Sequence, residues 1–477
     1  MKAFNFLLTL IILFPQLHAQ TLNEKLTAAM NMLEKDDQFK HASTSLYVMN
    51  SKTGTVLVAK NAELGLAPAS CQKIITSASA FEMLGKNFCF TTYIMRDPAG
   101  PDDEAKQKAG SLFIEGRGDP TLGSWRWSGT TDTAIFLKIA ALLKKNKVIS
   151  FERNLYVNDL FYGFEVTPDG WIWQDMGNYY GASCFGFNWH ENQYDIAFQP
   201  NQDEGWPTDI VSIKPELPGV IFQNNIKTGA KGSGDNGYIY AAPYSNYIIT
   251  EGTVPQQKNP FSITGSMPDP AAAFKYGLMG YLKNKNITIK GKAYSYTECI
   301  RNGLSYQLPM RFIDSIMSPP LDSINYWFLK KSVNLYGESF LKAIAVKKYP
   351  AGISNGIYDS AINMIKNFWN KNGIDKDAIN IIDGSGLSPA NRVTTHALVT
   401  VMQYARDKEW FNSFYNALPE INGIKMKDGY ISGVRSYTGY IKSKDGNEYT
   451  FSFIANNFSG SAGTVREKMW KLLDLLK

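Results

Sequence analysis

The sequence predicts an α+β fold in which a domain of helices packed on an antiparallel sheet is interrupted by a mostly β insertion. Two observations lead to this prediction. Both ends of the chain alternate strand-like and helix-like runs in the same style, which indicates one domain built from the two ends. Residues 92–267 differ from both ends, because they are rich in Gly, Pro, Asn, Asp and aromatic residues and contain short β-like runs.

The first end of the chain contains the elements of a small sheet with helices. Residues 21–35 carry apolar side chains at helical spacing. Residues 43–49 and 55–60 have the pattern of two strands joined by a hairpin. After Pro68 a second helix is expected over residues 70–84, because the apolar pattern stops there, before a glycine.

The rest of the chain divides at residue 267. The insertion is expected over residues 95–267, between two parts of the first domain at residues 20–94 and 268–477. Its expected strands cover residues 111–115, 154–157, 194–198 and 220–224, and its expected helix covers residues 132–147. Later helices are expected at residues 270–283, 313–317, 321–330, 332–346, 358–372 and 461–476, and later strands at residues 430–442 and 448–456.

The first residues have the pattern of an export signal. Lys2 gives a positive start, residues 4–17 form an apolar run too short for a membrane span, and Leu17-His18-Ala19 offers a cleavage site. We expect residues 1–19 to be a signal peptide that is removed. The mature protein is expected to be soluble and secreted across the inner membrane into the periplasm.

Composition narrows the class of protein. With 44% hydrophobic and 19% charged residues, the chain is a folded globular protein rather than a disordered one. A net charge of +6 is small for 477 residues, so no nucleic-acid partner is expected. A mildly basic surface is compatible with peripheral association with anionic membrane faces.

Cysteine and histidine are not spaced as in metal sites, so no metal is expected. An exported protein can form disulfides, and the sequence leaves open whether the cysteines form none, one or two. A structural role is expected for each histidine that follows the signal. The cysteines are Cys71, Cys89, Cys184 and Cys299, and the histidines are His41, His190 and His396.

Ser70 and Lys73 are the first candidate catalytic residues. They are three positions apart on an expected helix and therefore project from the same face. A serine hydroxyl becomes a good nucleophile when a neighbouring base takes its proton, and a lysine can be that base if burial lowers its pKa. Such a pair is common by chance, as a helix cap and a surface lysine, so it needs further evidence.

A second polar string supplies part of that evidence. Ser332-Val333-Asn334 follows two lysines and is expected to start a helix with Ser332 as the N-cap. The cap alone is an alternative explanation of this string. Ser323-Ile324-Asn325 is a rival, but it lies inside an apolar helical stretch.

A Ser-Lys enzyme also needs a lysine on a strand edge that holds the substrate. Lys427-Asp428-Gly429 is the candidate, because it comes last in the chain and leads into a plausible strand. Two rivals match the usual Lys-Thr-Gly better. Lys52-Thr53-Gly54 lies before Ser70 at a hairpin tip, and Lys227-Thr228-Gly229 lies within the insertion.

These strings together resemble the D-alanyl-D-alanine carboxypeptidase/endopeptidase family, the class C low-molecular-mass penicillin-binding proteins (peptidase family S13). The resemblance covers nearly the whole mature chain, and the order of the strings makes it specific. The strings are Ala67-Pro68-Ala69-Ser70 with Lys73, Gly116-Arg117-Gly118-Asp119-Pro120-Thr121-Leu122, Ser332-Val333-Asn334-Leu335, Asp383-Gly384-Ser385-Gly386-Leu387-Ser388 with Asn391-Arg392-Val393, and Lys427-Asp428-Gly429 running into Ser432-Gly433-Val434-Arg435.

The resemblance implies a penicillin-recognising core and a set of roles. Ser70 would attack the carbonyl that follows a D-alanine, Lys73 would take its proton, and Lys427 would keep Lys73 poised. Ser332 would pass the proton to the leaving amine, and Asn334 would bind the substrate amide. No metal or organic cofactor is implied. The implied partners are peptidoglycan stem peptides and β-lactam antibiotics.

Residues around the third string are the candidate substrate-binding residues: Asp428, Gly429, Tyr430 and Arg435. By resemblance, the backbone N–H groups of Ser70 and Tyr430 would form an oxyanion hole. Asp428 stands where the family has Thr or Ser, and an ionised carboxylate there would repel the carboxylate of a free peptide. Val333 replaces the usual Asp of the second string, a smaller departure.

Two other functions remain open from the sequence. A serine β-lactamase or esterase shares the Ser-x-x-Lys arrangement. A degenerate peptidoglycan-binding protein would keep the fold without turnover, and Asp428 is the sequence feature that favours it.

Overall fold

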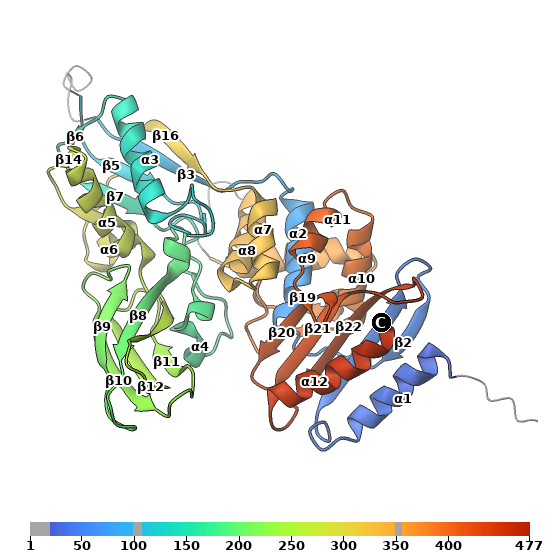
Figure 1. Cartoon of the computed structure of the whole chain (residues 1–477). Coiled ribbons are helices and arrows are strands. Elements are labelled where there is room, and N and C mark those ends of the chain that lie inside the picture. The colour runs from blue at the N-terminus through green and yellow to red at the C-terminus, as the bar shows by residue number, and fades with distance from the viewer. Residues whose placement is uncertain (1–19, 99–106, 349–354) are drawn as a thin grey trace, which may run out of the picture.

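The computed structural model describes residues 20–98, 107–348 and 355–477. The two ends of the chain form one lobe and the middle forms another (Figure 1). The expected signal peptide, residues 1–19, lies outside the described residues. No helix in the described ranges is both long enough and apolar enough to span a bilayer.

The first lobe is built on a six-stranded antiparallel sheet. The two chain ends meet in its centre, where Ser43 pairs with Asn456 and Asn50 pairs with Tyr449. This pairing confirms the predicted α+β domain assembled from both ends. In spatial order the strands are β19 (Glu420–Ile421), β20 (Ile424–Ile431), β21 (Val434–Lys442), β22 (Glu448–Asn456), β1 (Ser43–Asn50) and β2 (Val56–Lys60).

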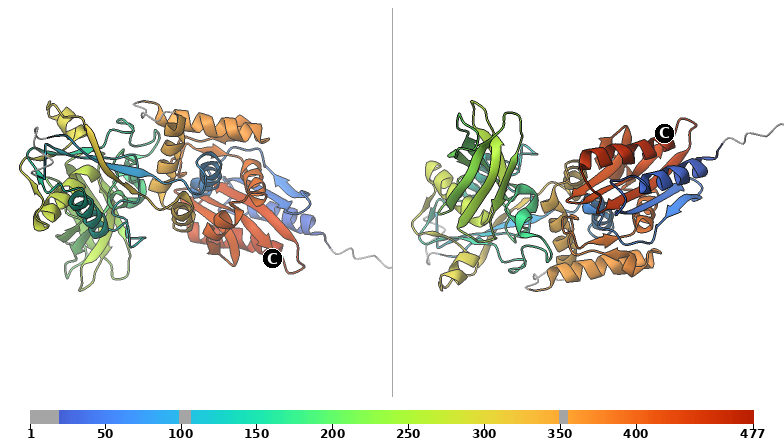
Figure 2. Two further views of the ribbon diagram at one scale, coloured as in Figure 1. Left: turned by 90° about the horizontal axis from the view of Figure 1, so that it is seen from above. Right: turned by 90° about the horizontal axis from the view of Figure 1, so that it is seen from below.

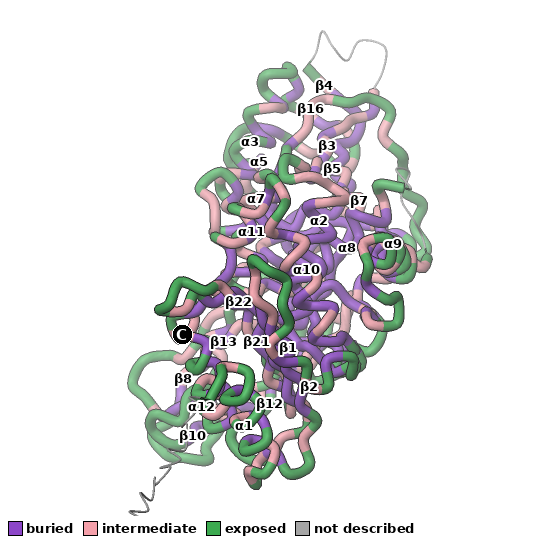
Figure 3. Tube along the Cα trace, turned by 90° about the vertical axis from the view of Figure 1, so that its right-hand side faces the viewer, coloured by how far each residue is buried: buried purple, intermediate pink, exposed green. Residues whose placement is uncertain are grey.

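Helices cover both faces of this sheet (Figures 1 and 2). One apolar core joins the sheet to α1 (Leu22–Glu34) and α12 (Ala462–Leu473). The other and larger core is mainly helical, and its helices are α2 (Lys73–Met83), α7 (Leu321–Lys330), α8 (Asn334–Lys348), α9 (Ile357–Lys371), α10 (Thr395–Arg406) and α11 (Phe411–Ala417). Both α2 and α8 are buried along most of their length (Figure 3), so the side chains they carry are held in fixed positions.

The middle of the chain forms the second lobe around a core of its own. A five-stranded sheet joins β15 (Ala293–Ser295), β7 (Leu155–Asn158), β5 (Leu112–Glu115), β3 (Thr91–Arg96) and β16 (Arg311–Met317), with α3 (Asp132–Lys145), α5 (Pro270–Asn284) and α6 (Tyr296–Arg301) in the same lobe. Below it lie two three-stranded sheets, β13-β8-β9 and β10-β12-β11. Their bounds are β8 (Gln193–Gln199), β9 (Asp209–Lys214), β10 (Ile221–Gly229), β11 (Asn236–Tyr240), β12 (Tyr247–Pro255) and β13 (Phe261–Ser266), and a small sheet of β14 (Thr288–Ile289), β6 (Ser150–Phe151) and β4 (Lys108–Ala109) completes the lobe.

The structure differs from the sequence prediction at three places. The insertion continues past residue 267, because α5, α6 and β14 to β16 belong to its sheets and core. Residues 313–317 were expected to be helical, but they lie in β16, which pairs with β3 more than 200 residues earlier. The expected strand over residues 430–442 is two strands, because Ser432 and Gly433 make a tight turn with Gly433 at φ +70°.

All four cysteines are free thiols. Of the three histidines that follow residue 19, two lie beside a carboxylate, His190 beside Asp132 and His396 beside Glu63. Among the described residues, no group of three or more His, Cys, Asp or Glu is arranged to hold a metal ion.

Candidate active site

Ser70 lies in a short 3-10 turn, Ala69–Gln72, directly before α2. The turn begins with Ala69 in the left-handed region at φ +45°, a conformation that costs a non-glycine residue free energy and is common at functional sites. Two glycines let neighbouring segments approach it. A Cβ on Gly386 would lie 2.0 Å from the Ala69 carbonyl oxygen, and a Cβ on Gly429 would lie 2.9 Å from the Ser70 nitrogen. Ser70 is therefore held between the 383–388 loop and β20.

Lys73 is fully buried beneath Ser70, with three oxygen atoms around its amine. Its Nζ lies 2.9 Å from Ser70 Oγ, 2.6 Å from Asn334 Oδ1 and 2.7 Å from the Ser385 carbonyl oxygen. Burial and then the nearby positive charge of Lys427 lower the pKa of Lys73 to about 7, although the carboxyl groups around it act in the opposite direction. At neutral pH a large share of Lys73 is thus the uncharged amine that can accept a proton.

Asn334 connects this lysine to the inserted lobe. It is the first residue of α8, its Oδ1 lies against Lys73, and its Nδ2 donates to the Tyr180 carbonyl at 2.7 Å. Ser332 is not the N-cap that was expected, because α8 begins two residues later and Ser332 has a left-handed φ of +56°. The Ser332 hydroxyl makes no hydrogen bond to any part of the chain that the structure describes.

Asp383 is the anchor of the loop that carries Ser385. Its carboxylate is fully buried and accepts hydrogen bonds from several donors. These donors tie the Ser70 turn, the inserted lobe and the loop to one point. They are Gln72 Nε2 at 2.9 Å, Trp171 Nε1 at 3.0 Å, Gly386 N at 2.8 Å, Ser388 N at 2.7 Å and Asn391 Nδ2 at 2.9 Å.

Glu338 is a second buried carboxyl group with a different environment. One turn after Asn334 on α8, it accepts a hydrogen bond from Gly384 N at 2.9 Å through Oε2. Its Oε1 is buried with no partner among the described residues. Burial, together with the neighbouring charge of Asp383, raises the pKa of Glu338 to about 8, so this carboxyl group is mostly protonated at pH 7. A neutral Glu338 leaves Lys73 without a second anion beside it.

Lys427 lies on the other side of Ser70, on β20, and its charge is already paired. Its buried ammonium donates to the Asp428 carboxylate at 2.9 Å and to the Asp428 carbonyl at 2.7 Å. Burial alone would raise the pKa of Asp428, but Lys427 and then Arg435 outweigh it and hold this pKa below its ordinary value. Asp428 is therefore an anion that neutralises Lys427.

The end of β20 leaves part of its backbone open to Ser70. β20 and β21 close with a two-residue turn between Ile431 and Val434, so residues 431 and 429 direct their backbone groups toward β21. Tyr430 alternates with them, and its N–H points to the free edge. Its side chain is exposed, with the Arg435 guanidinium 4.4 Å above the ring. The Ser436 hydroxyl donates to the Pro68 carbonyl at 2.5 Å, which fixes this edge to the Ser70 turn.

The structure brings Ser70, Lys73 and Asn334 into direct contact and places Lys427, Asp428, Gly429 and Tyr430 along β20 beside them, with Arg435 opposite Tyr430 on β21. Sequence reasoning assigned no role to Asp383 or Ser385, although they lie in a string that it singled out, and it assigned none to Glu338, which lies one helical turn after Asn334. Tyr180 was missed entirely, because its contribution is a backbone carbonyl and no local pattern marks it.

Comparison with protein families gives a match over residues 26–475 to the peptidase S13 family, described as D-Ala-D-Ala carboxypeptidase 3. Among curated proteins, a D-alanyl-D-alanine carboxypeptidase of Actinomadura sp. (strain R39) is 26% identical over 461 residues, covering 90% of this chain and 80% of the relative. The D-alanyl-D-alanine carboxypeptidase DacB of Haemophilus influenzae is 21% identical over 446 residues, covering 86% of this chain and 84% of the relative.

Solved structures show the same fold. Penicillin binding protein 4 of Haemophilus influenzae superposes with a TM-score of 0.78 at 18% identity, covering 95% of this chain and 99% of that one. The same protein in complex with a β-lactam superposes with a TM-score of 0.73. The predicted penicillin-recognising fold is thus confirmed.

Proposed function

We propose that Ser70 forms the acyl-enzyme with peptidoglycan stem peptides. The premise is that this chain belongs to the D-Ala-D-Ala carboxypeptidase 3 (S13) family and is a serine-type D-Ala-D-Ala carboxypeptidase. The observation that supports this assignment most is the placement of the fully buried Lys73 amine 2.9 Å from the hydroxyl of the partly buried Ser70. The hydroxyl proton passes to neutral Lys73 as Ser70 Oγ attacks the carbonyl carbon that follows a D-alanine.

The oxyanion of the tetrahedral intermediate needs donors that are already in place. The Ser70 N–H lies close to Gly429 of β20. The register of the β20–β21 hairpin directs the Tyr430 N–H to the free edge of β20, which faces Ser70. Two such backbone donors stabilise the developing charge because they do not have to reorient during the reaction. Gly429 is part of this arrangement, since a larger residue would push the strand away from Ser70.

Asn334 and Ser332 are assigned to the substrate and the leaving group. Of the two Asn334 N–H bonds, one donates to Tyr180 and the other is left for the substrate amide carbonyl. The Ser332 hydroxyl, which makes no hydrogen bond to the described chain, is free to pass the proton from Lys73 to the departing D-alanine amine. Water then hydrolyses the ester, and Lys73 accepts the water proton in turn.

Asp428 determines which leaving groups the site accepts best. In the complex with free peptide, the terminal carboxylate would meet Lys427 already neutralised by Asp428. The site loses attraction for that carboxylate, on the order of a kcal/mol. Binding of cross-linked peptides depends less on attraction of a terminal carboxylate by Lys427. We therefore assign the enzyme endopeptidase activity together with slow carboxypeptidase activity.

β-Lactam antibiotics are expected to acylate Ser70, since the relative with this fold was solved with one bound. The site of action is outside the cytoplasm, from the export pattern of residues 1–19. Labelling with a fluorescent penicillin tests the proposal, and we expect stable labelling that disappears in Ser70→Ala. Absence of labelling would favour the non-catalytic binding protein, and rapid hydrolysis of the drug would favour a β-lactamase.

A further inference from the structure

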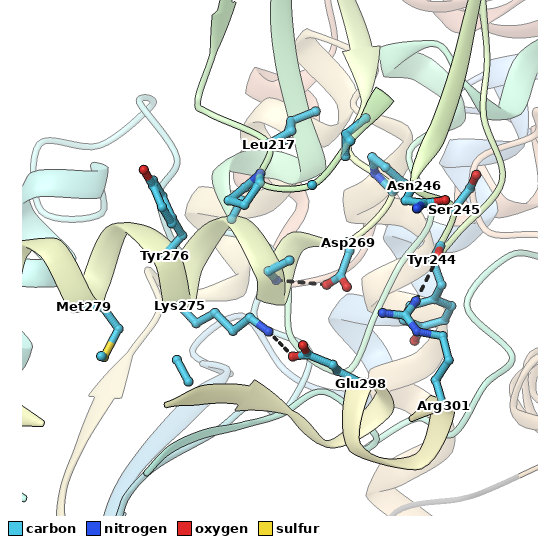
Figure 4. A pocket seen from close by; sticks show the side chains of 17 residues that line it. Leu217, Tyr244, Ser245, Asn246, Asp269, Lys275, Tyr276, Met279, Glu298 and Arg301 are labelled. Atoms are coloured by element: carbon cyan, nitrogen blue, oxygen red, sulfur yellow. Dashed lines mark hydrogen bonds and ion pairs between the residues drawn. The ribbon is translucent and has the colours of Figure 1, made fainter. Parts of the chain in front are cut away.

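The inserted lobe contains a crevice that takes no part in the catalytic site. It encloses about 470 Å³ between α5 and α6 on one side and the loops before β10 and β12 on the other (Figure 4). It therefore lies where the two parts of the inserted lobe meet. Junctions of this kind are common places for ligand sites, and the volume is in the range that buries a small ligand.

One wall of the crevice is apolar and aromatic. Leu217 and Val220 line it from the loop before β10, and Met279 and Tyr276 line it from α5. Tyr276 is 52% exposed, so one side of its ring is open to solvent. An exposed aromatic ring of this kind has an apolar surface that is stabilised by contact with a ligand's C–H groups.

The opposite wall carries polar groups with unused hydrogen-bonding capacity. Lys275 forms an ion pair with Glu298 Oε2, and both side chains are largely shielded from water, at 13% and 24% exposure. Glu298 Oε1 accepts no hydrogen bond from the described residues. Arg301 donates through Nη1 to the Tyr244 carbonyl at 3.0 Å, which leaves further N–H groups on a planar fork.

The charges around the crevice balance, and this excludes several ligand classes. Two cations, Lys275 and Arg301, face two carboxyl groups, Asp269 and Glu298. A phosphate or a lone carboxylate would meet the acidic groups, and a fatty chain would bury the polar wall without partners. The crevice fits a neutral ligand with one apolar face and several hydroxyl or amide groups.

We propose that this crevice binds an N-acetylated hexose unit of the peptidoglycan glycan strand. The C–H face of the sugar ring packs on Tyr276, and its hydroxyl and acetamido groups bond to Arg301 and Glu298. This inference rests on the proposed function, because stem peptides are attached to that strand. A second contact on the same polymer raises the effective concentration of peptide at Ser70 without changing the chemistry there.

The probe for the test is a soluble tetramer of β-1,4-linked N-acetylglucosamine, titrated into the mature protein by calorimetry. We expect saturable binding at one site, weakened about tenfold or more in Tyr276→Ala and in Arg301→Ala. Trp206→Ala is the matched control, because Trp206 is an exposed aromatic residue of the same lobe that does not line the crevice. Its binding should equal that of the parent.

D-alanine release provides the functional readout. Tyr276→Ala and Arg301→Ala should release D-alanine from soluble pentapeptide at the parent rate, and from insoluble peptidoglycan several-fold more slowly. The inference is overturned if the tetramer does not bind, if neither variant weakens binding, or if Trp206→Ala weakens it equally. Penicillin labelling is measured in parallel, so a labelled protein that binds no sugar contradicts this inference alone. A protein that binds sugar but takes no label contradicts the proposed function alone.

Discussion

The two sides of the candidate active site hold their lysines in opposite ways. Lys73, on the side made by α2, α8 and the 383–388 loop, has only neutral oxygen atoms within hydrogen-bonding distance. Lys427, on the β20 side, is in contact with the carboxylate of its neighbour Asp428. Burial lowers the pKa of Lys73, so its amine can accept a proton, whereas Lys427 is held in an ion pair. One lysine is thus suited to act as a base and the other to act as a fixed charge.

Two buried carboxyl groups lie on the Lys73 side, and their environments differ as well. Asp383 accepts hydrogen bonds from several donors, while the Glu338 carboxyl group accepts one, and burial raises the pKa of Glu338 to about 8. Buried carboxyl groups with a raised pKa are a common feature of enzyme active sites. The predictions below test this contrast between the α2–α8 side and the β20 side.

Replacing the base should have the largest effect. Lys73→Met keeps most of the side-chain volume and removes the proton acceptor, so acylation by penicillin should slow by about 10³-fold. The free energy of unfolding should fall by no more than about 3 kcal/mol, because removal of a buried amine offsets part of the loss of its hydrogen bonds to Asn334 and Ser385. Stopped-flow labelling and urea unfolding measure the two quantities. Acylation near the parent rate would show that Lys73 is not the base.

Two variants of Glu338 test whether its carboxyl group is neutral or ionised. In Glu338→Ala, the buried Gly384 N–H loses its partner, which should cost about 2 kcal/mol of unfolding free energy. Glu338→Gln keeps a neutral acceptor, so the midpoint of the acylation–pH profile should stay near pH 7. If Glu338 were ionised, the Gln variant would move that midpoint to lower pH, because an anion that raises the pKa of Lys73 would be gone.

Asp428 is the corresponding test of the β20 side. Asp428→Thr frees Lys427 to attract a terminal carboxylate, so turnover of free pentapeptide should rise by about five- to tenfold. Turnover of cross-linked dimer should change less. Release of D-alanine from both substrates is the measurement. An unchanged rate on pentapeptide would contradict the role given to this residue.

The smallest expected effect is a shift of the acylation–pH profile, in opposite directions for two variants on the β20 side. The acylation rate should rise with pH through about 7, since Lys73 must be neutral to act. The charge of Lys427 lowers the pKa of Lys73, so Lys427→Met should move the midpoint to higher pH. Asp428 raises that pKa, so Asp428→Asn should move it to lower pH. Equal midpoints in both variants would show that the β20 side does not influence the base.

The sequence predicted a contact correctly where the two residues lie close together in one short string. Ser70 and Lys73 share one turn of helix, so their contact could be predicted from spacing alone. The partners of Lys73 could not, because Asn334 and Ser385 arrive from segments more than 250 residues away. The β16 strand was missed for the same reason, since its pairing with β3 decides its structure. The extent of the insertion depends on such long-range pairing, which composition does not reveal.

The central claim is that Ser70 is the nucleophile and neutral Lys73 its base. Mass spectrometry of peptides from penicillin-treated protein, at pH 6, 7 and 8, tests it most directly. We predict one adduct, on the peptide that contains Ser70, that forms faster as the pH rises through about 7 and is absent in Ser70→Ala. An adduct on another residue, or an acylation rate independent of pH in this range, would contradict the claim.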